Sequence, residues 1–251
     1  MKTFKTLAKA LMAVLMIACI SSCNKDNNED GSIFNEKKLT KISFPNGQYI
    51  SFFYDQKGRL IEAEERYSDN YFKETIIWGD DAVKINTKSL YDGQESTNSY
   101  TIPLTNGMIQ SYYFNSSQYT ASYNQSNRLI EWGKERNKTC LIWDGDKLVS
   151  VTKDNYGHIY DNTLTYEKSC EKGYFPLLSY LIEVGHSFYL FLAHPELLGL
   201  RTNQLPARIT RVYEGNDPIE VSYSYEFNNE GYISKIASTY EDEGTCTLTW
   251  N

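Results

Sequence analysis

One short unit recurs along most of this chain, and it decides what the chain can fold into. In its first copy an aromatic strand over residues 50–54 leads through a turn with Gly58 into a second strand that begins at Leu60. The same order of aromatic residue, Asp or Asn, turn and apolar residue returns at Tyr123 and at Phe227. Repetition of this unit predicts consecutive antiparallel strands joined by tight turns.

The spacing within the unit has a physical reason. In these three copies an apolar residue stands six positions after the aromatic residue, and a shorter form with five positions begins at Trp78 and Trp143. Asp and Asn side chains accept hydrogen bonds from turn N–H groups, and Gly or Asn adopts the positive φ that closes the turn. We therefore expect each unit to be a β-hairpin.

The strands beside the first turn alternate in character. We expect Phe53, Ile61 and Ala63 to pack into a core, while Phe52 and Tyr54 make the opposite face aromatic as well. Two explanations stay open: both faces of the sheet are covered, or one face is a broad tyrosine-lined surface.

The full set of expected strands indicates the fold class. Strands are expected over residues 39–45, 48–55, 60–67, 72–78, 83–90, 97–103, 108–115, 118–124, 129–135, 139–144, 147–153, 160–167, 206–213, 219–227, 232–240 and 244–250. A sheet of this many strands leaves long edges unless it closes. We therefore expect an all-β, antiparallel up-and-down meander, closed or rolled into a barrel-like sheet.

One apolar stretch, residues 175–200, interrupts the hairpins. Pro176 and Pro195 bracket it and Gly185 divides it, which favours short helical turns over one long helix. Its apolar side chains need cover, and the β-structure supplies it. We expect a plug or cap within an insert over residues 168–205.

The N-terminus predicts export and lipidation. Lysines precede a short apolar run, and Cys23 follows it in a context that looks like a bacterial lipobox. Cys19 is the competing position, and an ordinary cleaved signal is the other alternative. We expect a signal peptide over residues 1–22, an acylated Cys23 with a disordered tether over residues 23–38, and a single β domain over residues 39–251. The lipid would hold the protein at the outer membrane, on its surface or periplasmic side.

Charge and cysteine content narrow the function further. The net charge of -7 argues against a nucleic-acid partner, because phosphate binding needs a basic face. Cys140, Cys170 and Cys246 allow at most one disulfide, for which Cys140 and Cys246 are the candidate pair, and we expect buried free thiols instead. Their spacing does not match a zinc or redox motif.

Few residues suggest catalysis. Ser187 lies in a Gly-His-Ser segment that lacks the final Gly of the esterase nucleophile elbow. His158, His186 and His194 do not have the spacing of a helical zinc pair, so we expect no metal and no cofactor. Asp144 and Asp146 offer oxygens that calcium could use, but the remaining ligands of a calcium loop are absent. We therefore interpret the clustered carboxylates as solvated turn or strand residues. These carboxylates are Glu62, Glu64, Glu65, Asp80, Asp81, Asp144, Asp146, Glu241, Asp242 and Glu243.

The aromatic residues favour binding over catalysis. Trp78, Trp132, Trp143 and Trp250, with many tyrosines, would provide stacking platforms for a glycan or a peptide, although strand aromatics more often pack against one another.

The residues from Phe52 to Leu60 resemble the tyrosine–aspartate repeats of rearrangement-hotspot proteins. In layout the chain resembles a family of gut-anaerobe lipoproteins of unknown function with a porin-like fold. The shared features are the lipobox, the acidic tether, the aromatic hairpins and an apolar insert that leads into a segment from Asn203 to Pro206. The resemblance implies a barrel-like sheet and supplies no catalytic residues.

We therefore expect a lipid-anchored envelope protein that is not an enzyme and that binds or scaffolds a partner. One alternative is an integral outer-membrane barrel, although charges such as Glu64, Lys84 and Lys134 interrupt its strands. The other alternative is a carbohydrate-active hydrolase, which requires facing carboxylates in a cleft.

Overall fold

The computed structural model describes residues 36–114, 116–181, 189–239 and 244–251. Lys37–Asn251 forms one compact unit, and the fold below is that of this unit. The signal peptide, Cys19, Cys23, His186, Ser187 and the acidic group at residues 241–243 lie outside the described residues.

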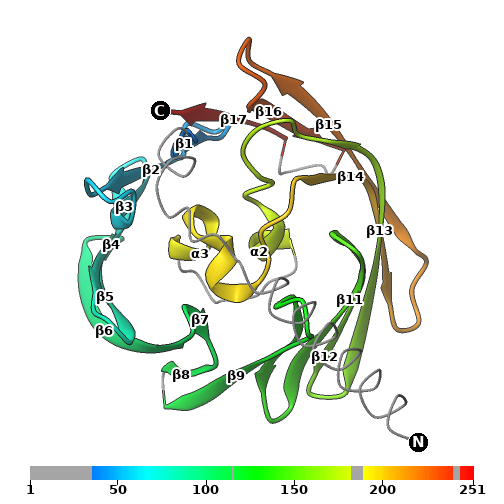
Figure 1. The fold of residues 1–251 in the computed structure, drawn as a ribbon, viewed down its shortest axis with the longest axis horizontal. Helices are drawn as coiled ribbons and strands as arrows, with labels where there is room; N and C mark the ends of the chain where they lie inside the picture. Colours follow the sequence, from blue (N-terminus) through cyan, green and yellow to red (C-terminus); the bar gives the residue numbers. More distant parts are fainter. Residues whose placement is uncertain (1–35, 115, 182–188, 240–243) are drawn as a thin grey trace, which may run out of the picture. The chain divides into compact units, whose positions relative to one another are not determined.

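The described strands form one seventeen-stranded antiparallel sheet (Figure 1). Its strands are β1 (Leu39–Ser43), β2 (Tyr49–Tyr54), β3 (Leu60–Tyr67), β4 (Asn70–Trp78), β5 (Ala82–Tyr91), β6 (Gln94–Thr105), β7 (Met108–Ile109), β8 (Ser111–Phe114), β9 (Ser117–Tyr123), β10 (Leu129–Lys134), β11 (Asn137–Asp144), β12 (Lys147–Asn155), β13 (His158–Ser169), β14 (Gln204–Tyr213), β15 (Ile219–Phe227), β16 (Ile233–Ser238) and β17 (Thr245–Trp250).

The sheet is a nearly closed barrel. Apart from β7 and β8, strands adjacent in the chain pair with each other, and β17 returns to pair with β1. Gln110 divides the strand expected over residues 108–115, so that β7 pairs with β6 and β8 pairs with β9. The predicted all-β meander that closes into a barrel-like sheet is confirmed.

The repeated turns are built as the spacing predicted. At Asp55, Asn124 and Asn228 the side-chain Oδ1 accepts backbone N–H groups two and four residues later, at 2.9–3.0 Å. The residue three positions on has positive φ in each turn and is Gly or Asn. Each turn therefore satisfies its own backbone groups and fixes the register of the strands that it joins.

A β-bulge follows the first residue of several strands, and it changes which side chains face inward. The register shifts leave one residue unpaired on seven strands: Thr40, Ile61, Ile130, Val149, Glu167, Ala207 and Ser234. In β3 both Leu60 and Ala63 are buried, although they are three residues apart. The expectation that Phe53 and Ile61 join the core was wrong, and they are 50% and 39% exposed. Phe53 alternates with the buried Ile50 and Phe52 of β2, and Ile61 is the unpaired residue that the bulge adds between Leu60 and Glu62.

Aromatic side chains at the strand ends bind the backbone beside these bulges. Seven of them donate a hydrogen bond to a carbonyl 14–19 residues earlier: Tyr54, Trp78, Tyr123, Trp143, Tyr166, Tyr225 and Trp250. Six of the accepting carbonyls belong to the residue directly before a bulge: Leu39, Leu60, Leu129, Leu148, Pro206 and Ile233. A bulge disrupts the ladder, so a side-chain donor replaces the missing bond. We call these contacts the carbonyl clasps.

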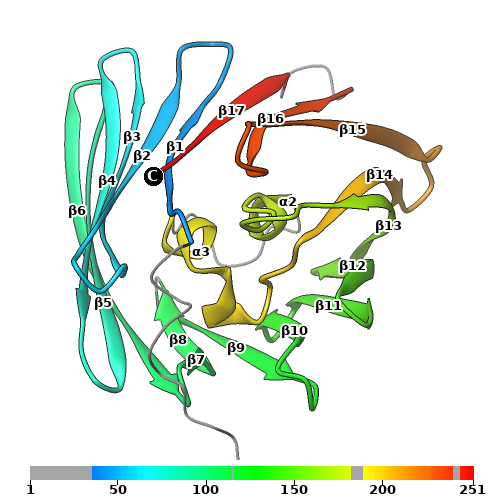
Figure 2. The same cartoon turned by 45° about the horizontal axis from the view of Figure 1, so that its top comes forward.

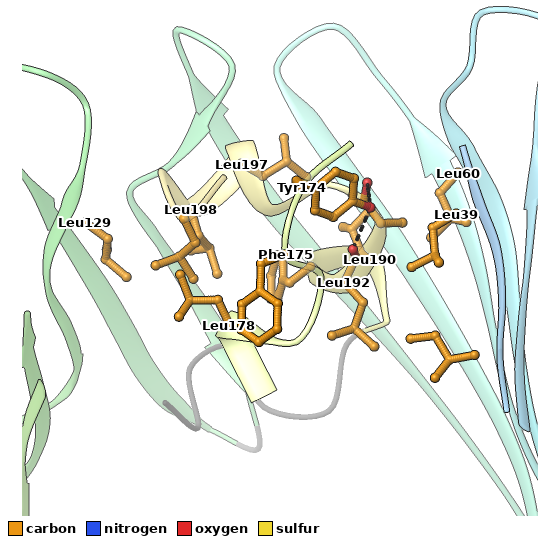
Figure 3. Close-up of a cluster of buried hydrophobic side chains, with 14 of the residues drawn as sticks. Leu39, Leu60, Leu129, Tyr174, Phe175, Leu178, Leu190, Leu192, Leu197 and Leu198 are labelled. Atoms are coloured by element: carbon orange, nitrogen blue, oxygen red, sulfur yellow. Dashed lines mark hydrogen bonds between the residues drawn. The ribbon is translucent and has the colours of Figure 1, made fainter. Parts of the chain in front are cut away.

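The insert between β13 and β14 lies inside the ring of strands, as Figures 1 and 2 show. It contains α2 (Leu178–Leu181), α3 (Leu190–Ala193) and the 3₁₀ helix η2 (Pro195–Leu198). Its leucines pack against strand residues such as Leu39, Leu60 and Leu129 (Figure 3). Burying one such side chain contributes about 1.5–3 kcal/mol, so the insert and the barrel wall stabilise each other. The predicted plug is confirmed.

The insert is also fixed to the turns at one end of the barrel. Gly199 has φ 63°, and a Cβ there would lie 2.2 Å from the carbonyl oxygen of Asn127. Thr202 Oγ1 donates to the carbonyl of Asp146 at 2.8 Å, and Arg128 donates to the carbonyl of Arg201. This close approach closes the turn end of the barrel.

The outer face carries ion pairs between neighbouring strands. The pairs are Glu62 with Lys73, Glu95 with Lys88, Glu131 with Lys138, Glu220 with Arg208, and Glu226 with Lys235. Most of these positions alternate with buried residues, so the interior is apolar and the ion pairs face outward. The outer face also exposes large apolar side chains, among them Phe53, Ile61, Ile77, Ile130, Ile142 and Tyr113. In the described part of the chain, no helix is long and apolar enough to cross a membrane.

The three described cysteines are free thiols. Cys170 and Cys246 are buried as expected, and burial raises the pKa of Cys246 to about 11. Cys140 is exposed, contrary to the expectation, because the alternation of β11 turns its neighbours Thr139 and Leu141 inward.

Candidate functional site

A cavity of about 610 Å³ opens at the end of the barrel opposite the Asx turns. It lies among β2 to β5 and is lined by Asn46, Gln48, Glu65, Tyr67, Asn70, Tyr71, Phe72, Ser89, Leu90 and Tyr91. We call it the mouth pocket. Its volume falls within the roughly 300–1,000 Å³ of small-molecule sites.

Strand register gathers these side chains. Tyr67 stands opposite Asn70 across the β3–β4 pair, and Glu65 stands opposite Phe72. Glu65 and Tyr67 share the parity of the buried Ala63 and therefore point toward the interior side of the sheet. The strands extend past the buried core here, so inward positions become the wall of an open pocket.

The start of α3 touches the same strand positions. Glu65 accepts hydrogen bonds from the side chains of Gln48 and Tyr189, and the ring of Phe72 meets the ring of Tyr189 edge to face at 5.6 Å. Two strands and the insert thus hold one side of the pocket in a fixed arrangement. The Glu65 carboxylate supplies acceptor oxygens to its protein neighbours.

Glu74 lies on β4 two residues after Phe72, nearer the middle of the strand, and does not line the mouth pocket. Its side chain is fully buried, and Oε2 accepts the backbone N–H of Leu190 at 3.3 Å. Oε1 has no hydrogen-bond partner among the described residues. Burial raises the pKa of Glu74 to about 8, although backbone N–H groups of Tyr189 and Leu190 oppose the shift. Glu74 is therefore mostly protonated at neutral pH.

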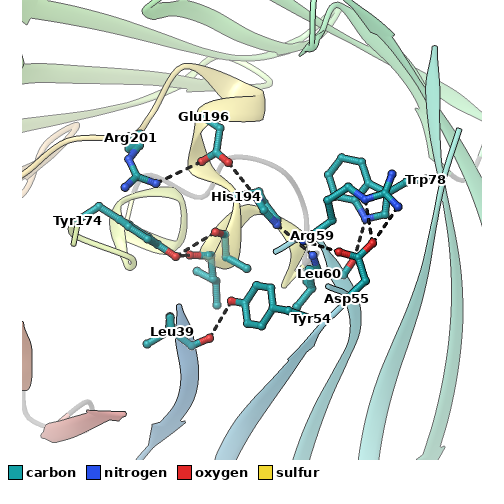
Figure 4. A network of polar contacts seen from close by, with 12 residues as sticks. Leu39, Tyr54, Asp55, Arg59, Leu60, Trp78, Tyr174, His194, Glu196 and Arg201 are labelled. Atoms are coloured by element: carbon teal, nitrogen blue, oxygen red, sulfur yellow. Dashed lines mark hydrogen bonds and ion pairs between the residues drawn. The ribbon is translucent and has the colours of Figure 1, made fainter. Parts of the chain in front are cut away.

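Of the histidines considered in the sequence, His194 connects the insert to the barrel wall. His194 Nε2 accepts the backbone N–H of Leu60 at 3.1 Å, and Nδ1 lies 2.7 Å from Glu196 Oε1 (Figure 4). This pairing places the proton on Nδ1 and leaves neither ring nitrogen open. Arg201 lies 3.8 Å from the same carboxylate, so the chain of contacts links the insert to β3. His158 is exposed at the start of β13.

The other candidates are also dispersed. Trp78, Trp143 and Trp250 belong to the carbonyl clasps, and Trp132 is buried, so these rings do not form an open platform. Asp146 pairs with Arg128 in a turn. Within the described ranges there is no group of three or more His, Cys, Asp or Glu residues that would hold a metal ion.

Sequence reasoning missed the mouth pocket. Two of its tyrosines, Tyr67 and Tyr91, directly precede hairpin turns. An aromatic residue followed by polar turn residues was the feature of the sequence that could have indicated the pocket. The register needed to bring these turns together is a property of the closed sheet.

Comparison with known proteins supports the fold. No family model and no curated protein matches the chain. A porin-like protein from Bacteroides uniformis has a similar structure, with a TM-score of 0.62, 14% identity, and coverage of 86% of this chain and 96% of that one. A porin-like protein from Bacteroides vulgatus gives 0.60 and 15%, with coverage of 85% and 99%. The chain therefore shares the barrel fold of these porin-like proteins.

Proposed function

We propose that this protein is a lipid-anchored binding module of the cell envelope and that it is not an enzyme. In this proposal the barrel stands outside the bilayer, and acylated Cys23 anchors it to the outer membrane through the tether. The mouth pocket is the surface that meets a ligand.

The main support is the distribution of polarity between the two faces of the barrel. A membrane barrel turns an apolar band about 25 Å tall toward lipid and keeps its interior polar. Here the interior is packed with the leucines of the insert, while pairs such as Glu62 with Lys73 and Glu131 with Lys138 face outward. Ion pairs among the exposed apolar side chains of the outer face are unlike the continuous apolar band that meets lipid, and the packed apolar interior is unlike a water-filled channel.

The arrangement of the carboxylates favours binding over hydrolysis. A glycosidase needs an acid and a second carboxylate that both reach the substrate. Glu65 lines the mouth pocket, but Glu74, whose pKa is raised, is fully buried and outside the lining. The two groups thus lack shared access to one substrate.

The alternative is an integral outer-membrane barrel, which the likeness to porin-like proteins favours. Fractionation of the full-length protein, expressed in an outer-membrane-bearing host, separates the two. The Cys23→Ser variant carries, in place of residues 1–22, a signal peptide that is cleaved without lipidation, so that no apolar leader remains. We expect the wild type in the membrane fraction and this variant in the soluble fraction without detergent. Cys140→Ser, which alters an exposed thiol of the barrel, is the matched control and should remain with the membrane. Retention of Cys23→Ser after alkaline extraction would establish the integral barrel instead.

A further inference from the structure

We propose that the mouth pocket binds a neutral carbohydrate chain; this inference rests on the proposed function as a binding module. The pocket combines exposed aromatic rings with amide side chains, and the sections of the wall that carry them are fixed by strand pairing.

The aromatic residues point to a ligand with an apolar face. Tyr67 and Tyr91 are 48% and 68% exposed, although large aromatic rings stabilise proteins chiefly when they are buried. Both rings border one cavity with Phe72. A sugar ring presents a face of C–H groups that packs on such rings, while its hydroxyl groups remain at the edge.

The polar residues point to hydroxyl groups. Asn46, Gln48 and Asn70 place amides on the wall. Asn46 Nδ2 donates to Gln48 Oε1 and Gln48 Nε2 donates to Glu65, and each of these amide nitrogens has a second N–H for a ligand. Asn70 Oδ1 accepts the N–H of Asp92 at 3.1 Å, which holds the side chain in place and turns its amide nitrogen to other partners. Amides in fixed positions suit the mixed donor and acceptor character of a sugar hydroxyl.

The charges disfavour an acidic ligand. Among the described residues that line the pocket none is Lys or Arg, and Glu65 contributes a carboxylate. An anion would approach this carboxylate without a compensating cation, which costs free energy in a partly desolvated pocket.

The strand pairing disfavours an extended peptide. Peptides commonly bind a sheet by adding a strand to an open edge. Strands β2 to β5 are hydrogen-bonded on both sides, so this part of the wall offers no edge. A ligand here must be recognised by side chains, as a carbohydrate is.

The test measures binding to the full-length protein in detergent. The probes are neutral oligosaccharides of glucose, mannose, xylose and galactose, an oligogalacturonate and a mixed-sequence peptide pool, followed by calorimetry and saturation-transfer NMR. The variants are Tyr67→Ala and Tyr91→Ala, with Tyr113→Ala as the matched control because Tyr113 is 64% exposed and lies outside the pocket. Thermal melts establish that each variant is folded.

We expect at least one neutral oligosaccharide to bind, with its ring C–H protons receiving saturation. Each pocket variant should weaken binding about tenfold or more, which corresponds to the loss of about 1.4 kcal/mol, while Tyr113→Ala binds like the wild type. The proposal is overturned if no neutral oligosaccharide binds, if only the oligogalacturonate or peptide binds, or if both pocket variants retain full affinity. The Cys23→Ser fractionation uses no ligand. A failure to bind oligosaccharides would therefore leave the conclusion about the membrane anchor unchanged.

Discussion

Replacing Glu74 by Gln should change how the stability of the barrel depends on pH. The Glu74 side chain is fully buried, and burial raises its pKa from 4.5 to about 8. Gln has nearly the same shape as the protonated carboxyl group and carries no charge at any pH. The substitution therefore keeps the packing beside α3 and removes the titration.

The sign and size follow from linkage. Between pH 4.5 and about 8 the folded protein holds a proton on Glu74 that the unfolded chain has released, so the free energy of unfolding falls as pH rises. At about 1.36 kcal/mol per pKa unit, the rise in the pKa of Glu74 corresponds to roughly 5 kcal/mol of stability. This stabilisation is fully present below pH 4.5 and is lost by a pH of about 8.

The assay is urea unfolding of wild type, Glu74→Gln and Glu95→Gln at a series of pH values across this range. Glu95 is exposed on β6 and controls for the loss of any one carboxylate. We expect Glu74→Gln to match the wild type near the acid end and to exceed it by several kcal/mol near the alkaline end. Parallel profiles for wild type and Glu74→Gln would refute the reasoning, because they would mean that Glu74 does not hold a proton in the folded protein.

Two further substitutions test the architecture. Trp143→Phe keeps an aromatic ring but removes the donor to the Leu129 carbonyl, so the free energy of unfolding should fall by about 1–3 kcal/mol in urea melts; an unchanged value would show that the clasp contributes nothing. Gly199→Ala should lower the melting temperature sharply because its Cβ would clash with Asn127, whereas Gly93→Ala, at a similar positive φ but with open space around it, should cost far less; equal losses would contradict the close approach.

The strands and turns could be predicted from the sequence because their causes are local. The Asx turn at Asp55 needs only its own side chain and a glycine three residues later, and both are visible in the sequence. Strand alternation was less reliable. A bulge at Ile61 adds one residue to β3, so Leu60 and Ala63 both face inward while Ile61 faces outward. A bulge is a property of two paired strands, and a period of two read along one strand does not contain it.

The candidate site was harder to predict because the same residue types serve two purposes. The tryptophans looked like platforms, yet Trp78 and Trp143 satisfy backbone carbonyls within the wall. Tyr67 and Tyr91, which border the pocket, also stand at the C-terminal ends of their strands, but these antiparallel strands end at the opposite end of the barrel. To distinguish an aromatic residue that bonds to a backbone carbonyl from one that borders the pocket, one must know at which end of the barrel its strand ends.

The two ends of this barrel thus differ in how tightly their side chains are packed. At one end the Asx turns, the carbonyl clasps and the insert interlock, and a change there, as at Gly199, disturbs packed backbone. At the other end the hairpin tips around Tyr67 and Tyr91 extend beyond the core and carry exposed side chains. Substitutions at these tips remove few buried contacts, so they alter the pocket at little cost to the free energy of folding. Under the binding function proposed above, a filled barrel of this kind would change its ligand while its fold stays the same, because the pocket and the packed core are built from different residues.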